Sequence, residues 1–245
     1  MFFKRKLSRQ FTLETTSGKT RSEYSLEYAQ KDIEKIIALI DSSDSKNLTE
    51  ADTCLQFILP FFQVFGWNSG NTYWRAQFRI GYSYKHVDYA FSKQGKSWAY
   101  IEAKRLGMKN IGRNKNFIKQ ISGYFNASPG AHLIILTNGE EYCFYSYGES
   151  SEICTTPFLR FNIRNIDLTG SARPLCHLFY NNFHMADWPK YAEMSRALAE
   201  IRHALRHAPD SLSKDSIIEK SFALLYPHLD EAQRKEWIAF FNEFS

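Results

Sequence analysis

The stretch of sequence that decides the fold is Lys85-His-Val-Asp-Tyr-Ala-Phe91 together with Trp98-Ala-Tyr-Ile-Glu-Ala-Lys104. Both segments are rich in aromatic and β-branched residues, and the turn-like sequence Ser92-Lys-Gln-Gly-Lys96 separates them. This pattern predicts a β-hairpin or meander. Side chains two residues apart on a strand lie on one face of the sheet, so Glu102 and Lys104 are expected to point the same way. Asp88 joins them if the two strands pair in a compatible register.

Two carboxylates and one ammonium group on one sheet face suit the hydrolysis of a phosphodiester bond. Carboxylates bind Mg²⁺, which polarises the phosphoryl oxygen and lowers the pKa of a bound water. A nearby lysine positions or deprotonates that water and stabilises charge in the transition state. The alternative is a solvated pair of opposite charges on an exposed strand, which is common. The apolar neighbours of Glu102 and Lys104 favour the hydrolytic interpretation.

A basic segment follows directly. From Lys104 to Gln120 there are six basic residues, counting Lys104, and no acidic one. We expect this segment to contact a phosphate backbone, although a solvated basic loop is the alternative. Gly107 and Gly112 are expected to let the backbone approach a ligand closely. The residues predicted to bind nucleic acid are Arg105, Lys109, Arg113, Lys115 and Lys119.

A helix is predicted over residues 117–125. Gln120 and Tyr124 are four apart and therefore share a face of this helix. We expect both to reach toward the sheet, where they bind phosphate or orient Lys104. Taken alone, such a pair is typical of an ordinary helix surface.

The flanking sequence predicts helices and further strands. Thr49 caps a helix that ends at Gly66, and Pro60 kinks or breaks it. Asn138-Gly139 marks the turn of a hairpin. Helices are also predicted over residues 22–41, 188–207, 214–225 and 231–244, and strands over 73–78, 82–91, 98–104, 132–137, 142–147 and 158–163. Three regions follow: a lead-in with one helix over 1–46, an α/β core over 47–170 and a helical region over 171–245.

Composition narrows the class of protein. The chain has 245 residues, 44% of them hydrophobic, and a net charge of +5, which is typical of a globular protein and compatible with a nucleic-acid partner. No apolar run is long enough for a membrane helix, and no apolar stretch follows the basic N-terminus as in a signal peptide. The four cysteines are scattered, which argues against a disulfide framework or a zinc knuckle. We therefore expect a cytoplasmic protein without a membrane partner.

A Walker-like fragment and the apolar residues of the last helix bear on nucleotide binding and on partners. Ser17-Gly-Lys-Thr20 is the only Walker-like fragment, and it lacks the upstream glycine, since Leu13 stands there. It is interpreted as a turn, and nucleotide binding is not expected. In the last helix, apolar positions fit either core packing or a homodimer or partner-subunit interface, with core packing favoured: Trp237, Phe240, Phe241 and Phe244.

The motifs together resemble the PD-(D/E)xK nuclease superfamily, and more closely the N-terminal nuclease domain of type I restriction enzyme R subunits and their free-standing relatives. The resemblance covers about residues 47–147. Val87 stands where the superfamily name has proline. The motifs that carry the resemblance are Thr49-Glu-Ala-Asp-Thr53, Phe65-Gly-Trp67, Val87-Asp-Tyr-Ala90, Ile101-Glu-Ala-Lys104, Gln120 with Tyr124, and Leu136-Thr-Asn-Gly139.

The resemblance implies a fold, a cofactor and residue roles. The fold would be a restriction-endonuclease-like mixed β-sheet flanked by helices, here with a C-terminal helical extension and without a helicase motor. The cofactor would be Mg²⁺, for which Mn²⁺ is expected to substitute. Asp88, Glu102 and the Ala103 carbonyl would be metal ligands, with Glu50 approaching the site. Lys104 would be the catalytic lysine, and Gln120 and Tyr124 would match the Gln-x-x-x-Tyr element of the family.

The sequence thus predicts a Mg²⁺-dependent endonuclease that cleaves DNA, expected to be double-stranded, in restriction or antiphage defence. Two alternatives stay open. One is a catalytically dormant module of the same fold that binds nucleic acid or a partner. The other is an RNase.

Overall fold

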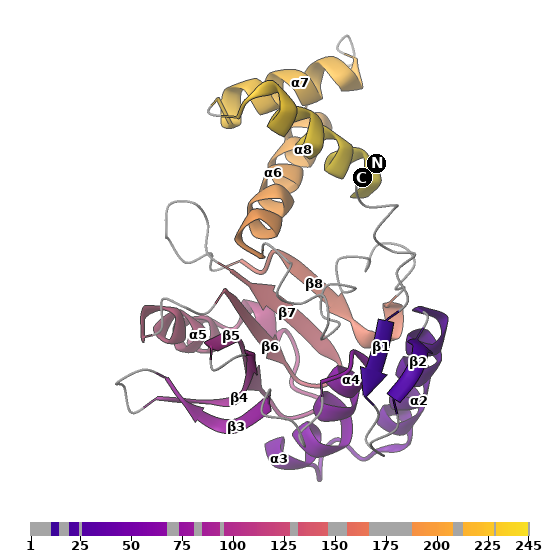
Figure 1. Cartoon of the computed structure of the whole chain (residues 1–245). Helices are drawn as coiled ribbons and strands as arrows, with labels where there is room; N and C mark the ends of the chain where they lie inside the picture. The colour runs from indigo at the N-terminus through magenta and orange to yellow at the C-terminus, as the bar shows by residue number, and fades with distance from the viewer. Residues whose placement is uncertain are drawn as a thin grey trace.

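Six strands form one mixed sheet in the order β3-β4-β5-β6-β7-β8 (Figure 1). The computed structural model describes residues 11–14, 20–24, 26–67, 74–80, 85–93, 96–127, 132–146, 156–166, 188–207, 213–227 and 229–244. The strands are β3 (Trp74–Arg79), β4 (His86–Lys93), β5 (Lys96–Ala103), β6 (Leu133–Thr137), β7 (Glu141–Tyr145) and β8 (Leu159–Asn162). β5 and β6 run parallel, and every other neighbouring pair is antiparallel. The predicted mixed sheet is confirmed.

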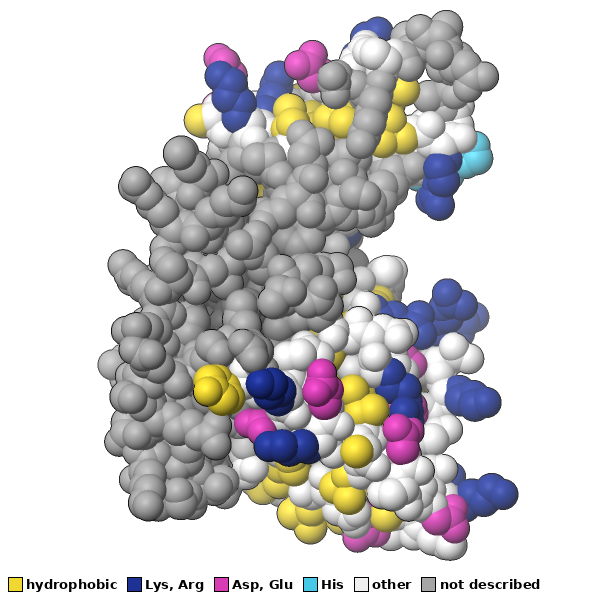
Figure 2. Space-filling model, turned by 90° about the vertical axis from the view of Figure 1, so that its right-hand side faces the viewer, with side chains coloured by type: hydrophobic (Ala, Val, Ile, Leu, Met, Phe, Trp, Pro, Cys, Tyr) yellow, Lys and Arg dark blue, Asp and Glu magenta, His cyan; other side chains and the backbone are white. Residues whose placement is uncertain are grey.

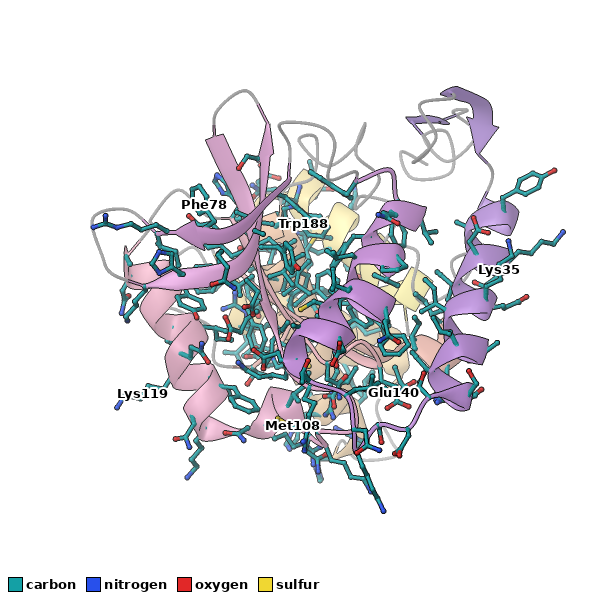
Figure 3. The ribbon with its side chains drawn as sticks, turned by 90° about the horizontal axis from the view of Figure 1, so that it is seen from below. Lys35, Phe78, Met108, Lys119, Glu140 and Trp188 are labelled. Carbon is teal, nitrogen blue, oxygen red and sulfur yellow. The ribbon has the colours of Figure 1, made fainter. Side chains whose placement is uncertain are left out.

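Helices cover both faces of this sheet. On one face lie α2 (Leu26–Ser42), α3 (Glu50–Thr53), the π-helical turn η1 (Cys54–Ile58) and α4 (Leu59–Val64). On the other lies α5 (Lys115–Ala127), which follows the short 3₁₀ helix η2 (Ile111–Arg113). Figure 3 shows α5, with Lys119 on its outer side, and the N-terminal helices on opposite sides of the strands. The predicted α/β class with flanking helices is therefore observed.

The alternation of β5 assigns its side chains to two separate cores. Ala99, Ile101 and Ala103 are buried among the residues of α2, η1 and α4. Tyr100 is buried on the other side with residues of α5. Glu102 and Lys104 have the same parity as Tyr100, so they lie on the α5 side, as the two-residue period predicts.

The second predicted helix exists, but in three pieces. Thr49 begins it with a capping box, in which the Thr49 hydroxyl and the Asp52 carboxylate each accept from the other's backbone N–H. Pro60 has no N–H to donate to the carbonyl four residues back. The chain widens just before it into the π turn, where the Leu59 N–H bonds to the Cys54 carbonyl. The helix ends before Gly66, whose φ is 86°.

The N-terminal region differs from its prediction. Two short antiparallel strands occur here, β1 (Phe11–Glu14) and β2 (Thr20–Tyr24), and β2 occupies the start of the helix predicted over residues 22–41, which begins at Leu26 instead. β1 alternates apolar and polar residues, but both strands are only a few residues long, so neither gives a clear signal in the sequence. Most of the Walker-like fragment, residues 17–19, lies outside the described residues. Helix α2 contributes buried residues to the main core: Ala29, Ile33, Ile36 and Ile40.

The C-terminal helices gather around a small core of their own. α6 (Trp188–Arg206), α7 (Lys214–Leu225) and α8 (Glu231–Phe244) agree with the predicted ranges. Trp188 is buried in the main core beside Phe158, whereas Trp237 is buried among the helices. Figure 1 shows these helices stacked beyond one end of the sheet. Core packing is thus the role of Trp237, and the side chains of the other three apolar residues of α8 lie outside those described.

The described residues also include a further short 3₁₀ helix and two of the four cysteines. η3 (Ile163–Asn165) follows β8 and completes the elements near the sheet. Within the described residues, no helix is both long and apolar enough to cross a membrane. Cys54 and Cys143 are buried free thiols, and the other two cysteines fall outside the described ranges.

Candidate active site

Strands β4 and β5 place Asp88 against the end of β5. Tyr89 pairs with Ile101 in the antiparallel register, so Asp88 and Glu102 are the next residues along the two strands. The Ala103 N–H donates to Asp88 Oδ2 over 2.8 Å. The Asp88 carboxylate therefore lies beside the backbone that joins Glu102 to Lys104. The register of β4 and β5 therefore brings Asp88 to Glu102 and Lys104, as the sequence-based prediction required.

Glu102 and Lys104 form a buried ion pair. Lys104 Nζ donates to Glu102 Oε1 over 2.5 Å, and the two residues are 7% and 4% exposed. Burying two charges costs free energy unless they are paired and hydrogen-bonded. Their burial on an otherwise apolar strand thus excludes the solvated cross-strand pair considered as the alternative.

Helix α5 supplies the remaining partners of Glu102. Gln120 Nε2 donates to Glu102 Oε1 over 2.6 Å, and the Tyr124 hydroxyl donates to Oε2 over 2.8 Å. Lys104 Nζ also donates to Gln120 Oε1 over 3.3 Å. Gln120 and Tyr124 therefore reach the sheet side by side, and both hold the Glu102 carboxylate directly.

Four charged groups influence one another at this position. Burial raises the pKa of Glu102, and repulsion by Asp88 adds to the effect, while the hydrogen bond and charge of Lys104 oppose it. Partial burial also raises the pKa of Glu50. The positive charge of Lys104 lowers this pKa, and the negative charge of Asp88 raises it further. Glu50 stands at the start of α3 and is largely exposed. The structure thus brings Glu50, Asp88, Glu102 and Lys104 into one electrostatic environment.

The carboxylate oxygens of Asp88 and Glu102 are ligands that suit a hard cation such as Mg²⁺. A carboxylate offers about four lone-pair positions. Each oxygen of Asp88 accepts one hydrogen bond from the protein, and Glu102 Oε2 also accepts one, so acceptor capacity remains. The repulsion that Asp88 exerts on Glu102 and on Glu50 is the kind that a bound cation relieves. Among the described residues no three His, Cys, Asp or Glu side chains form a ready metal cluster, so Glu50 does not complete one with Asp88 and Glu102.

An aromatic ring lies against the predicted catalytic lysine. Lys104 Nζ stands 4.9 Å from the centroid of the Phe117 ring on α5, which is within the range of a cation–π contact. The ammonium group is thus held by Glu102, Gln120 and Phe117. Sequence reasoning missed Phe117, because nothing local to the predicted helix indicates which strand it faces.

The side chains of the basic segment are exposed, while its backbone is hydrogen-bonded to neighbouring elements. All five of its predicted nucleic-acid-binding side chains are exposed. The Leu106 N–H donates to Thr53 Oγ1 over 2.9 Å, and Asn138 Nδ2 donates to the Met108 carbonyl over 2.7 Å. On the face shown in Figure 2, by contrast, the basic side chains of the described residues are interspersed with acidic ones.

The glycines of this segment lie close to other side chains of the protein. Gly107 adopts φ +82°, and a Cβ built on it would lie 3.2 Å from Ser45 Oγ. A Cβ on Gly112 would lie 2.6 Å from Cys143 Sγ. Both glycines therefore let the segment pack against the protein itself. The expected close approach of a ligand at these positions stays a prediction.

Sequence reasoning also missed Gln77. Its side chain, on β3, donates from Nε2 to Asp88 Oδ1 over 3.1 Å. The predicted strand over residues 73–78 included this position. A meander pairs this strand with β4, but only the observed register places Gln77 across from Asp88.

Comparisons with known proteins give one distant likeness. No family model matches the chain, and no curated protein matches it. The chain is similar to a solved structure of the type IIG restriction endonuclease BpuSI, with 16% identity and a TM-score of 0.32. The likeness covers 58% of this chain and 17% of that protein.

Proposed function

We propose that this protein is a Mg²⁺-dependent nuclease that hydrolyses DNA phosphodiester bonds. The observation that carries the proposal is the meeting of Asp88, Glu102 and Lys104 at the end of β5, with Glu102 and Lys104 buried and paired. Buried ionisable groups with specific charge partners are typical of functional sites. A structural ion pair would not need the second carboxylate, which repels the first.

The roles of the residues follow from their contacts. Asp88 and Glu102 would hold the metal ion, with the Ala103 carbonyl as an additional ligand and Glu50 nearby. A bound Mg²⁺ supplies a polarised phosphoryl oxygen and a water of lowered pKa. Mn²⁺ is expected to replace it.

The remaining side chains act around the two ligands. Lys104 would orient the attacking water and stabilise negative charge in the transition state. Gln120 and Tyr124 orient Glu102 by donating to its two oxygens. We infer that the exposed basic side chains at 105, 109, 113, 115 and 119 hold the phosphate backbone of double-stranded DNA. The sequence resemblance to type I restriction enzyme R subunits supports a role in restriction or antiphage defence.

The direct test is incubation of the purified protein with plasmid DNA, with and without Mg²⁺. Glu102→Gln, Asp88→Ala and Lys104→Ala are expected to reduce the cleavage rate by roughly a hundred-fold or more. A matched control is Glu141→Gln, because Glu141 forms an ion pair with Arg160 over 2.7 Å on β7 and β8. The control is expected to cleave as the wild type does. Wild-type cleavage by folded Glu102→Gln would overturn the proposed site.

One observation favours a dormant binding module as the second candidate. Glu102 accepts three hydrogen bonds from its neighbours, so the carboxylate is well satisfied within the protein. A gel shift in Ca²⁺ without cleavage in Mg²⁺ or Mn²⁺ would identify this function. Cleavage of RNA but not DNA in the same substrate panel would instead identify an RNase.

A further inference from the structure

Gln77 occupies a special position on β3, the edge strand beside β4. The residues on either side of it are in register with β4, since Ala76 pairs with Tyr89 and Phe78 with Val87. Gln77 therefore stands across from Asp88. Side chains that face each other across two antiparallel strands are close enough to interact.

The backbone at Gln77 is in the left-handed region. Its φ is +47°, and among the described residues the other non-glycine with positive φ is Asn110, at 55°. Glycine adopts this region without steric cost, and asparagine tolerates it comparatively well. Glutamine adopts it only rarely. A strained residue of this kind persists where the surrounding structure holds it, often at a functional site. The side chain of Gln77 is therefore the feature to explain.

That side chain completes the contacts of Asp88. Gln77 Nε2 donates to Oδ1 over 3.1 Å, and the Ala103 N–H donates to Oδ2 over 2.8 Å. The two donors engage different oxygens from the two neighbouring strands and so restrict the rotation of the carboxylate. Both donors are neutral. They leave the negative charge available to a cation, where a lysine or arginine would compete with it.

We propose that Gln77 is a positioning residue that orients the Asp88 carboxylate for metal binding. This inference rests on the proposed function of the same site. Groups that hydrogen-bond to a metal ligand orient it, and their loss typically lowers metal affinity or activity by about 10- to 100-fold. Gln77 would act through Asp88, to which it donates a hydrogen bond, and it belongs to none of the predicted motifs.

The test measures Ca²⁺ affinity by isothermal titration calorimetry, independently of catalysis. Gln77→Gly relieves the backbone strain and removes the donor, so its melting temperature is expected to stay level or rise while the Kd for Ca²⁺ rises about ten-fold. Gln77→Met keeps the length and the strain but cannot donate. It is expected to show the same loss of affinity with no gain in melting temperature. Metal-free DNA binding is expected to be unchanged in both variants.

Asn110→Gly is the matched control, because it removes a left-handed non-glycine elsewhere and is expected to leave the Kd for Ca²⁺ unchanged. If the wild type binds Ca²⁺ and both Gln77 variants bind it within about two-fold of that affinity, the positioning role is wrong and the proposed function stands. If the wild type binds no Ca²⁺ and cleaves no nucleic acid, the proposed function is wrong and the role of Gln77 falls with it.

Discussion

At the scale of the residue, Glu102 has the most demanding environment in the described site. It is 4% exposed, and burial raises the pKa of its carboxyl group. An ionised carboxylate is retained in such a place only when donors compensate for the lost hydration. Lys104, Gln120 and Tyr124 provide that compensation. Each of these three side chains therefore stabilises the fold and orients the proposed metal ligand through its hydrogen bond to a carboxylate oxygen of Glu102.

Replacing Tyr124 with phenylalanine separates these effects. Tyr124→Phe removes the donor to Glu102 Oε2 and leaves a buried oxygen without that partner. We expect the free energy of unfolding to fall by about 1–3 kcal/mol. The Mg²⁺-dependent cleavage rate is expected to fall about ten-fold. Urea denaturation and plasmid cleavage measure the two quantities.

The chain provides a matched control for this change. The Tyr226 hydroxyl donates to Glu200 Oε2 over 3.2 Å among the C-terminal helices. Tyr226→Phe removes the same kind of hydrogen bond at a more exposed glutamate, so its cost is expected to be about 1 kcal/mol or less, with cleavage unchanged. Equal cleavage by both variants would show that the hydroxyl of Tyr124 has no part in the reaction.

At the scale of the element, the capping box of α3 determines where Glu50 stands. The Thr49 hydroxyl and backbone N–H both donate to Asp52, and these bonds lower the pKa of the Asp52 carboxyl. A group whose pKa is depressed by folding stabilises the folded state above its ordinary pKa. That contribution disappears as the pH falls through the depressed value.

The pH dependence of the box can be measured. Asp52→Ala is expected to lower the melting temperature at pH 7, and the difference from the wild type is expected to shrink as the pH falls below the ordinary pKa of aspartate (about 4). Thr49→Ser keeps the hydroxyl and is expected to follow the wild-type profile. A difference that stays constant between pH 7 and strongly acidic pH would contradict a contribution from the ionised carboxylate.

The attachment of the basic segment to the sheet can be tested at Gly112. A Cβ at this position would lie 2.6 Å from Cys143 Sγ, which is closer than packed atoms allow. Gly112→Ala is expected to lower the free energy of unfolding by about 1–3 kcal/mol through overpacking. Cys143→Ala shortens the opposing side chain, so the double variant is expected to be more stable than the sum of the two changes predicts. Strict additivity in urea denaturation would contradict this contact.

At the scale of the whole molecule, the site lies on one sheet face while the C-terminal helices have their own core. Trp237 is 3% exposed, and its ring centroid lies 5.0 Å from that of Tyr226. Trp188 belongs instead to the core of the sheet. Helices α7 and α8 are therefore expected to open separately from the sheet, to which Trp188 attaches the start of α6.

Replacing each tryptophan tests this division. Trp237→Ala removes about 3–5 kcal/mol of local stability, so amide hydrogen exchange is expected to speed up in α7 and α8 but not in β5 or β6. Trp188→Ala is expected to speed exchange in the sheet as well. Equal acceleration in all regions by Trp237→Ala would indicate one cooperative unit.

Much of this architecture could be predicted from local patterns. The two-residue period of β5 placed Glu102 and Lys104 together and Ile101 opposite, and the structure agrees. Asp230 and Gln233 cap α8 reciprocally, and their three-residue spacing is the pattern of a capping box. Such features depend on neighbours within a few residues, and the sequence displays those directly. The catalytic and metal-binding roles remain predictions.

The sequence by itself determined the alternation of β5, the ranges of the C-terminal helices and the candidate acidic and basic residues. Only the tertiary structure decided that Gln77 reaches Asp88, that Phe117 lies against Lys104 and that Gly112 packs on Cys143. These contacts join elements that are distant along the chain or whose pairing no turn signal indicates. Periodicity specifies which face a side chain occupies, but the residue it meets depends on how the elements pack around the shared core.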